Sequence, residues 1–393
     1  MSNFSYYTPT HVYFGRGTQN QVGELVRAQS CKKVLIHYGG QSARRSGLLA
    51  QVEASLDAAG VAHVQLGGVV PNPHLSLVYE GIELCRREGV DFILAVGGGS
   101  VIDSAKAIGY GMCMDGDVWE LYNHTRRATG CLPIGVILTI AASGSEMSDS
   151  SVITKEEGGI KRGYNDDICR PKFAIMNPEL TMTLPDYQTA CGCTDILMHT
   201  MERYFVQGDA MEITDSIAEA LMRTVIKQAK ILRDDPKNYD ARAEVMWAGS
   251  LSHNGLTGCG HDGSDFASHR LEHEMGGMFD VAHGAGLAAV WGSWARYVYQ
   301  NCMPRFVRFA RNVMGVDAAL SDDAAALRGI ELMEDFFRSI HMPTCFSELG
   351  IHPTQEQLEE MAHKCRIAVG GLLGSAKKLD EGDMLAIYKM ANH

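Results

Sequence analysis

The stretch Phe92–Ser100, which reads FILAVGGGS, decides the fold of the first half of this chain. A short, continuous apolar run is typical of a strand that is buried on both faces of a parallel sheet. The glycines after it let the backbone turn sharply and approach a bulky ligand. A helix is predicted to follow through Ile108, and the free N–H groups at its start suit a pyrophosphate. We therefore predict phosphate binding by Gly97, Gly98, Gly99 and Ser100.

This interpretation has a simpler alternative. An ordinary connection between a strand and a helix could use Ser100 as its N-cap, although successive glycines are more than a cap needs. The stretch also lacks the G-x-G-x-x-G spacing of the usual dinucleotide-binding fingerprint. The prediction of a phosphate site therefore depends on glycine content and on the position between strand and helix.

Strand-like and helix-like patterns alternate on both sides of this stretch. Helical spacing over Ala43–Ala59 and Leu75–Glu88 separates apolar runs, which indicates βαβ units and a parallel sheet. The predicted strands are Lys33–Tyr38, Val61–Leu66, Phe92–Val96, Leu132–Leu138 and Phe173–Met176.

The pattern changes near Pro185, after which almost no strand signal remains. A proline at this point is typical of a helix entry. The sequence therefore predicts an α/β, Rossmann-like dinucleotide-binding domain over residues 1–185 and an all-α domain over residues 186–393. The predicted helices of the second domain are Asp186–Phe205, Thr214–Leu232, Ala241–Thr257, Asp265–Met275, Gly286–Tyr299, Ala324–Ile340 and Thr354–Ala368.

A second glycine-containing turn follows the strand Lys33–Tyr38. NAD-specific sites usually hold the ribose hydroxyls with an acidic residue at such a strand end, and this turn has none. Its small residues, the hydroxyl of Ser42 and the side chains of Arg44 and Arg45 would accommodate a 2′-phosphate, which favours NADP. An ordinary solvated loop is the alternative.

Histidines cluster in the second half of the chain. Asp195 and His199 are four residues apart on a predicted helix and share a face. His269 and His273 have the same spacing, and His283 follows in a glycine-flanked stretch. A lone histidine would usually be a core or surface residue. One carboxylate with several imidazoles is instead a plausible donor set for a divalent transition metal.

The segment His269–His273 also matches H-x-x-E-H, the inverted motif of some zinc proteases. Glu272 would then be the general base, and both histidines would bind zinc. Short motifs of this kind occur by chance, and a protease would leave the glycine-rich half without a function. We therefore keep the protease as a minor alternative.

The combined motifs resemble the iron-containing (group III) alcohol dehydrogenases, and within them the branch of butanol dehydrogenases and NADPH-dependent aldehyde reductases. The resemblance covers nearly the whole chain and implies an α/β half followed by an all-α half, as in the related dehydroquinate synthase-like fold. The stretches that carry it are Val12–Gly17, Gly39–Ser42, Pro71–Pro73, Gly97–Asp103, Thr139–Glu146, Asn177–Pro178, Cys193–Glu202 and His269–Gly284.

The resemblance implies roles for individual residues. His273 would be a catalytic residue near the nicotinamide and not a metal ligand. Gln41 stands where close relatives often have another glycine, and Glu272 is not a family feature and is interpreted as incidental. The implied metal ligands are Asp195, His199, His269 and His283. The implied dinucleotide contacts are Gly39, Gly40, Ser42, Asn72, Gly97, Gly98, Gly99, Ser100, Asp103, Thr139, Ser143 and Lys161.

The implied function is hydride transfer between NADP(H), with NAD possible, and a short-chain primary alcohol or aldehyde such as butanol or butanal. Fe(II) is the implied metal and Zn(II) the alternative, and either would polarise a carbonyl as a Lewis acid. A glycerol dehydrogenase and a dehydroquinate synthase-like cyclase are alternatives on the same scaffold. The cyclase should need several basic residues near Asp195–Arg203 or His269–His283, where the sequence has no cluster of them. A nucleotide-sensing protein without catalysis is a further alternative, against which the intact ligand set argues.

Composition indicates the cellular context. A net charge of -12 without any Lys/Arg-rich run argues against nucleic acid as a partner. No apolar run is long enough to cross a membrane, and Met1–Thr10 lacks a signal-peptide pattern. Eleven cysteines without any C-x-x-C motif favour reduced thiols and a cytoplasmic protein. The segment Tyr6–Phe14 resembles first strands that pair across a two-fold axis in relatives, so we expect a homodimer.

Overall fold

The computed structural model describes residues 1–208 and 211–393. Internal contacts group Thr8–Thr183 into one unit, and Met1–Tyr7 together with Leu184–His393 into another. The first seven residues thus belong with the helical half, where the backbone N–H of Ser2 donates a hydrogen bond to the carbonyl of Gly260 (3.0 Å).

The α/β unit is built on a parallel sheet, as the sequence predicts. Among the described residues its strand order is β1-β8-β5-β4-β2-β3, and all neighbouring strands in it run parallel. The central strand, β4, is buried along its whole length, because helices cover both of its faces. The strands are β1 (His11–Phe14), β2 (Lys33–Tyr38), β3 (Ala62–Leu66), β4 (Phe92–Gly97), β5 (Ile134–Leu138) and β8 (Phe173–Met176).

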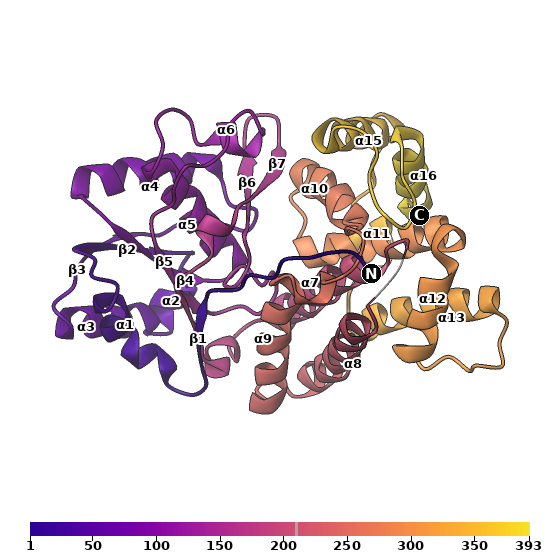
Figure 1. The fold of residues 1–393 in the computed structure, drawn as a ribbon, viewed down its shortest axis with the longest axis horizontal. Helices are drawn as coiled ribbons and strands as arrows, with labels where there is room; N and C mark the ends of the chain where they lie inside the picture. The colour runs from indigo at the N-terminus through magenta and orange to yellow at the C-terminus, as the bar shows by residue number, and fades with distance from the viewer. Residues whose placement is uncertain (209–210) are drawn as a thin grey trace. The chain divides into compact units, whose positions relative to one another are not determined.

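Two pairs of helices sandwich this sheet (Figure 1). Helices α1 (Val22–Arg27) and α3 (Leu48–Ala58) pack on one face, where alternate strand residues such as Ile36 and Leu94 share their core. Helices α4 (Leu75–Glu88) and α5 (Gly99–Met112) pack together on the other face.

The α/β unit differs from the sequence prediction at several places. The short helices α1 and α6 (Trp119–Tyr122) were not predicted. The predicted helix Ala43–Ala59 is divided into α2 (Ser42–Arg45) and α3, because Gly47 adopts a left-handed conformation (φ 78°) between them. An antiparallel hairpin of β6 (Ser150–Lys155) and β7 (Ile160–Asn165) was not predicted. The hairpin packs against α5, outside the main sheet.

The second unit is helical, with only an isolated bridge between Leu373 and Leu379 among its described residues. Its helix α7 starts directly after Pro185, as predicted, and contacts α8, α9, α10 and α11. Helices α12 and α16 were not predicted. The helices of eight or more residues are α7 (Asp186–Tyr204), α8 (Glu212–Asp234), α9 (Tyr239–His253), α10 (Ala267–Phe279), α11 (His283–Val298), α12 (Met303–Asn312), α13 (Asp322–Ser339), α15 (Gln355–Val369) and α16 (Glu381–Ala391).

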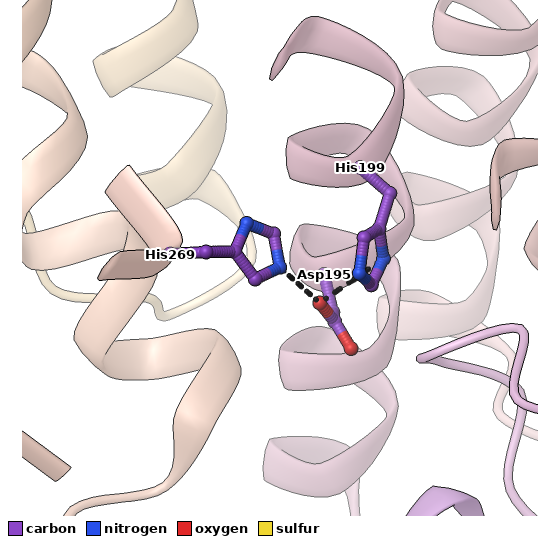
Figure 2. A group of neighbouring side chains, drawn as sticks. All are labelled: Asp195, His199 and His269. Atoms are coloured by element: carbon purple, nitrogen blue, oxygen red, sulfur yellow. Dashed lines mark ion pairs between the residues drawn. The ribbon is translucent and has the colours of Figure 1, made fainter. Parts of the chain in front are cut away.

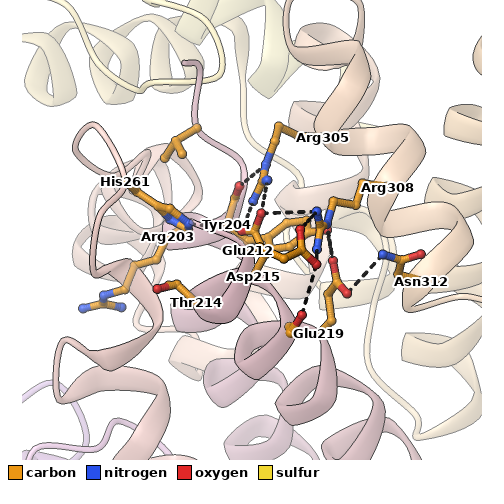
Figure 3. Close-up of polar contacts among 12 residues, drawn as sticks. Arg203, Tyr204, Glu212, Thr214, Asp215, Glu219, His261, Arg305, Arg308 and Asn312 are labelled. Atoms are coloured by element: carbon orange, nitrogen blue, oxygen red, sulfur yellow. Dashed lines mark hydrogen bonds and ion pairs between the residues drawn. The ribbon is translucent and has the colours of Figure 1, made fainter. Parts of the chain in front are cut away.

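A buried ion-pair network connects the end of α7 to α8 and α12 (Figure 3). The guanidinium of Arg305 donates two hydrogen bonds of 2.6 Å to the carboxylate of Asp215 and another to the carbonyl of Tyr204 (2.8 Å). Burial raises the pKa of Asp215, but Arg305 and His261 lower it more, so that it lies well below its usual value. The carboxylate therefore stays ionised and fixes these three helices together.

No helix in residues 1–208 or 211–393 is both long and apolar enough to span a membrane.

Candidate functional site

The carboxyl ends of three neighbouring strands bring the predicted dinucleotide residues to one edge of the sheet. Tyr38 of β2 pairs with Val96 of β4, and Gly97 pairs with Leu138 of β5, so these strands end at one level. Strand β3 lies on one side of β2, and the next strand in the chain, β4, lies on the other side of β2. In open α/β sheets, ligands bind at such a switch of direction.

The glycine turn lies directly against the loop that follows β5. Gly98 is the N-cap of α5, so Ser100 lies in the first turn of the helix and is not its cap. The backbone N–H of Thr139 donates to the carbonyl of Gly97 (3.0 Å). A Cβ on Gly99 would lie 2.2 Å from Ser143 Oγ. Thr139 and Ser143, predicted from different parts of the chain, are thus brought to the glycine turn.

Asp103 holds the neighbouring loop in place. Its carboxylate accepts hydrogen bonds from Ser145 Oγ (2.6 Å) and from the backbone N–H of Val152 (3.1 Å). These contacts occupy the side chain that the resemblance assigns to the dinucleotide, and they indicate a supporting role for Asp103 in that site.

Lys106, one turn further along α5, was missed in the sequence. Its side chain is fully buried, and Nζ donates hydrogen bonds to the carbonyl oxygens of Ser145 (2.8 Å), Ser148 (3.0 Å) and Ser150 (2.7 Å). A lysine among the apolar residues of the helix after the glycine turn is the signal that could have found it, because buried charges need several partners.

A cavity of about 410 Å³ opens at the end of β2. It is lined by Tyr38, Gly39, Gly40, Gln41, Arg44, Gly67 and Gly68. None of these residues is acidic. The Arg44 side chain contacts the hydroxyl of Tyr38, and its guanidinium lies 5.1 Å from the centre of that ring. Ser42 starts α2 beside the cavity without lining it.

The hairpin brings Asn72 and Lys161 toward each other. The carbonyl of Pro73, next to Asn72, accepts a hydrogen bond from the backbone N–H of Thr154 in β6 (2.8 Å). Thr154 is the register partner of Lys161 in β7. The hairpin, which the sequence did not predict, is therefore the element that places Lys161 in this half of the protein.

In the helical unit, three imidazoles converge on one carboxylate oxygen. Asp195 Oδ1 lies 3.4 Å from His199 Nδ1, 3.4 Å from His269 Nε2 and 3.7 Å from His283 Nε2. Figure 2 shows the first two of these histidines facing Asp195 from α7 and α10. Ligand atoms of Asp195, His199 and His269 all lie within 4.8 Å of one another. The four residues that the resemblance implied as ligands thus come together.

The atoms in this group suit a divalent cation. Asp195 Oδ1, His199 Nδ1 and His269 Nε2 are buried, and the described part of the chain offers none of them a hydrogen-bond partner. Such atoms are costly to bury unless another group compensates them. Two ligands that are each about 2.1 Å from one ion in tetrahedral geometry lie about 3.4 Å apart. The observed spacing matches that value, so the donor set fits a metal ion.

Two further carboxylates face the remaining nitrogens of two of these histidines. Glu202 contacts His269 Nδ1 and also accepts the backbone N–H of His269 (3.0 Å). Glu272 contacts His283 Nδ1. Our interpretation of Glu272 as incidental was wrong, because it is fully buried and in contact with a residue of the cluster. Sequence spacing alone does not reveal either contact.

Charges in the cluster shift the pKa values of its histidines. Burial, together with His253 and His269, holds the pKa of His199 well below its usual value. Burial also lowers the pKa of His269, but Glu202 and Asp195 raise it further, to about 9. His199 is therefore neutral and can bind a cation without losing a proton. His269 would have to release a proton before it could bind the same cation.

His273 lies at the margin of the cluster. Its ring centre is 6.0 Å from that of His283, and it is buried. His269 contacts Asp195 directly, with 3.4 Å between its Nε2 and Asp195 Oδ1. The role of His273 as a catalytic residue that is not a ligand stays a prediction.

The chain belongs to the iron-containing alcohol dehydrogenase family. Residues 9–178 match the family described as iron-containing alcohol dehydrogenase. Residues 189–392 match the C-terminal part of the Fe-containing alcohol dehydrogenase family. These matches confirm the family that the sequence motifs resemble and its combination of an α/β half with a helical half.

Individual relatives cover almost the whole chain. NADH-dependent butanol dehydrogenase A of Clostridium acetobutylicum is 39% identical over 99% of both chains. The NADPH-dependent aldehyde reductase YqhD of Escherichia coli is 34% identical, over 89% of this chain and 90% of its own. The crystal structure of NADH-dependent butanol dehydrogenase A of Thermotoga maritima superimposes with a TM-score of 0.96 at 36% identity, covering 100% of this chain and 99% of that one.

Proposed function

We propose that this protein is a metal-dependent oxidoreductase that interconverts short-chain primary alcohols and aldehydes with a nicotinamide dinucleotide. The observation that carries the proposal is the convergence of His199, His269 and His283 on one oxygen of Asp195. The named relatives support the substrate class, since they include butanol dehydrogenases and an aldehyde reductase.

The proposal gives each residue of the cluster a task. Asp195, His199, His269 and His283 would hold a divalent ion, which when bound supplies Lewis acidity toward a carbonyl or alcohol oxygen. His273, buried beside His283, holds or delivers the proton that accompanies hydride transfer. The hydride itself belongs to the dinucleotide. We favour Fe(II) as the ion, with Zn(II) as the alternative.

The dinucleotide would bind along the carboxyl edge of the sheet. The turn Gly97–Ser100 takes the pyrophosphate at the N-terminus of α5, with Thr139 and Ser143 beside it and Asn72 and Lys161 on the hairpin side. The cavity with Gly39 and Gly40 takes the adenosine ribose. Because that cavity has Arg44 and no acidic lining residue, we favour NADP(H), although several relatives are named as NADH-dependent.

The proposal also covers the oligomeric state of the protein and its cellular compartment. Strand β1 is an edge of the sheet, paired only with β8 among the described strands, so it offers backbone groups to a second copy. We propose a homodimer on this basis. The eleven cysteines, all of them among the described residues, form no disulfide, which supports a reducing compartment such as the cytoplasm.

The decisive experiment combines metal analysis with an activity assay. Protein prepared without oxygen is analysed for iron and zinc, then assayed with NADPH and NADH on butanal and other short aldehydes, and on glycerol in the oxidative direction. One bound ion per chain and faster oxidation of NADPH with butanal are expected. Full activity after complete removal of metal, or no aldehyde-dependent oxidation of either dinucleotide in metal-loaded protein, would refute the proposal.

A further inference from the structure

Glu272 lies on α10 between His269 and His273, and its side chain reaches α11. Its Oε2 atom contacts Nδ1 of His283, the first residue of α11. An ionised carboxylate only accepts hydrogen bonds, so this contact favours the tautomer with the proton on Nδ1. In that tautomer the lone pair of His283 lies on Nε2, the nitrogen that is 3.7 Å from Asp195 Oδ1.

The packing around Glu272 leaves space for this contact. The side chain is fully buried, and α10 packs against α11. A Cβ on Gly286, which lies in the first turn of α11, would come within 2.9 Å of Glu272 Cγ and 3.3 Å of its Oε1 atom. Glycine at 286 thus lets the carboxylate lie under the start of the helix that carries His283.

A similar contact joins α7 to α10. Glu202 on α7 contacts Nδ1 of His269 on α10, just as Glu272 on α10 contacts Nδ1 of His283 on α11. In both cases a carboxylate on one helix orients a histidine on another. His283 has the greater need of such a contact, because its side chain is 28% exposed whereas that of His269 is 7% exposed.

We propose that Glu272 is a positioning residue of the metal centre, which fixes His283 in the tautomer and orientation that present Nε2 to the ion. This inference rests on the proposed function. A carboxylate behind a metal-binding imidazole also makes that imidazole a stronger donor. Glu272 acts through His283 and needs no contact with substrate.

The test measures metal affinity rather than turnover. Co(II) is titrated anaerobically into metal-free parent protein, Glu272→Gln and Glu272→Ala, with a competing chelator and with the visible Co(II) spectrum recorded. Loss of such a carboxylate typically weakens metal binding about 10–100-fold. We expect a loss in this range, larger for Ala than for Gln, and an altered spectrum. Gly286→Ala, which displaces Glu272 without removing it, should weaken binding in the same direction.

Glu334→Gln is the matched control. Glu334 is also buried and contacts the same helix, α11, through Arg296 (2.7 Å). Its variant should lower the thermal unfolding temperature and leave Co(II) affinity and spectrum unchanged. Equal Co(II) affinity in the parent and both Glu272 variants would overturn the role of Glu272 while leaving the metal site intact. A parent that binds no Co(II) at all would overturn both the inference and the proposed function.

Discussion

Ser143 Oγ occupies the space that any side chain at position 99 would fill, because a Cβ on Gly99 would lie 2.2 Å from that oxygen. The turn after β4 and the loop after β5 therefore pack against each other. The missing side chain of Gly99 leaves the space that the Ser143 hydroxyl fills. The packing requirement at Gly99 is independent of its φ angle, which does not lie in the left-handed region.

Replacing Gly99 by alanine should weaken dinucleotide binding about tenfold, or about 1.4 kcal/mol. The added methyl group forces Ser143 away from the glycine turn. The dissociation constant of NADPH, measured by fluorescence titration, tests this expectation. Gly163→Ala is the control, since its Cβ would meet Val152 at an ordinary 3.6 Å. Unchanged binding in Gly99→Ala would show that this turn does not contact the dinucleotide.

His283→Ala and His273→Ala should have different consequences. Loss of His283 removes one of the groups around Asp195 Oδ1, so bound metal should fall sharply in anaerobic metal analysis. Loss of His273 should leave the metal content unchanged and lower kcat roughly 100-fold, the usual effect of removing a general acid or base. Metal loss in the His273 variant would show that the ligands are misassigned.

Arg44→Ala should raise the KM for NADPH roughly tenfold and change the KM for NADH little. The reason is that a hydrogen bond to a charged group contributes about 1.5–3 kcal/mol, and Arg44 lines the cavity at the end of β2. Arg45, which the sequence predicted as a second 2′-phosphate contact, is exposed and does not line this cavity, so Arg45→Ala serves as the control. Equal effects of Arg44→Ala on both dinucleotides would contradict a 2′-phosphate contact.

His37 should make the α/β unit sensitive to acid. The ring is buried in β2, with Nδ1 2.9 Å from the carbonyl of Leu66 and Nε2 2.9 Å from Ser104 Oγ, and burial lowers its pKa to about 4. Between pH 6.5 and pH 4 the unfolded chain binds the extra proton, so stability falls as the pH falls.

The size of this effect is up to about 3 kcal/mol at pH 4, at about 1.4 kcal/mol for each unit of pKa shift. Urea unfolding at several pH values should show it as a steeper pH dependence in the parent than in His37→Gln. The Gln variant cannot take up a proton, so an identical pH dependence in both proteins would exclude this role for His37.

Asp215→Ala should destabilise the helical unit by about 3–5 kcal/mol, because it leaves Arg305 buried without its main partner. Urea unfolding measures the change. Glu331→Ala, which removes an exposed ion pair with Arg328, should alter stability by no more than about 0.5 kcal/mol. A similar small change in Asp215→Ala would mean that water reaches Arg305.

The elements with strong local signals could be predicted from the sequence. The apolar run of β4 predicts a buried strand, and the spacing of apolar residues in α4 predicts a helix. Pro185 marks the start of α7. The hairpin β6–β7 could not be predicted, because its strands mix polar and charged residues and owe their conformation to pairing with each other. Helix α12, in contrast, could have been predicted, because its buried apolar residues Phe306, Phe309 and Ala310 follow helical spacing. Pro304 lies in its first turn, where proline does not interrupt a helix.

The candidate site likewise has residues that could be predicted from local sequence and residues whose roles depend on tertiary contacts. The spacing of Asp195 and His199 is a local property of one helix and could be read directly. The spacing of His269 and His273 is the same, and only the packing of α10 against α7 and α11 decides which of them faces Asp195. The roles of Glu202 and Glu272 depend on contacts between helices, which no periodicity reports.

Lys106 has a consequence for ligand binding. With its ammonium group shared among three carbonyl oxygens of the segment Ser145–Ser150, this segment is ordered before any dinucleotide arrives. Ordering a flexible backbone costs roughly 1–2 kcal/mol per residue. That entropic penalty is incurred during folding, so the affinity for the dinucleotide is not reduced by it, and the surface behaves as a preorganised receptor.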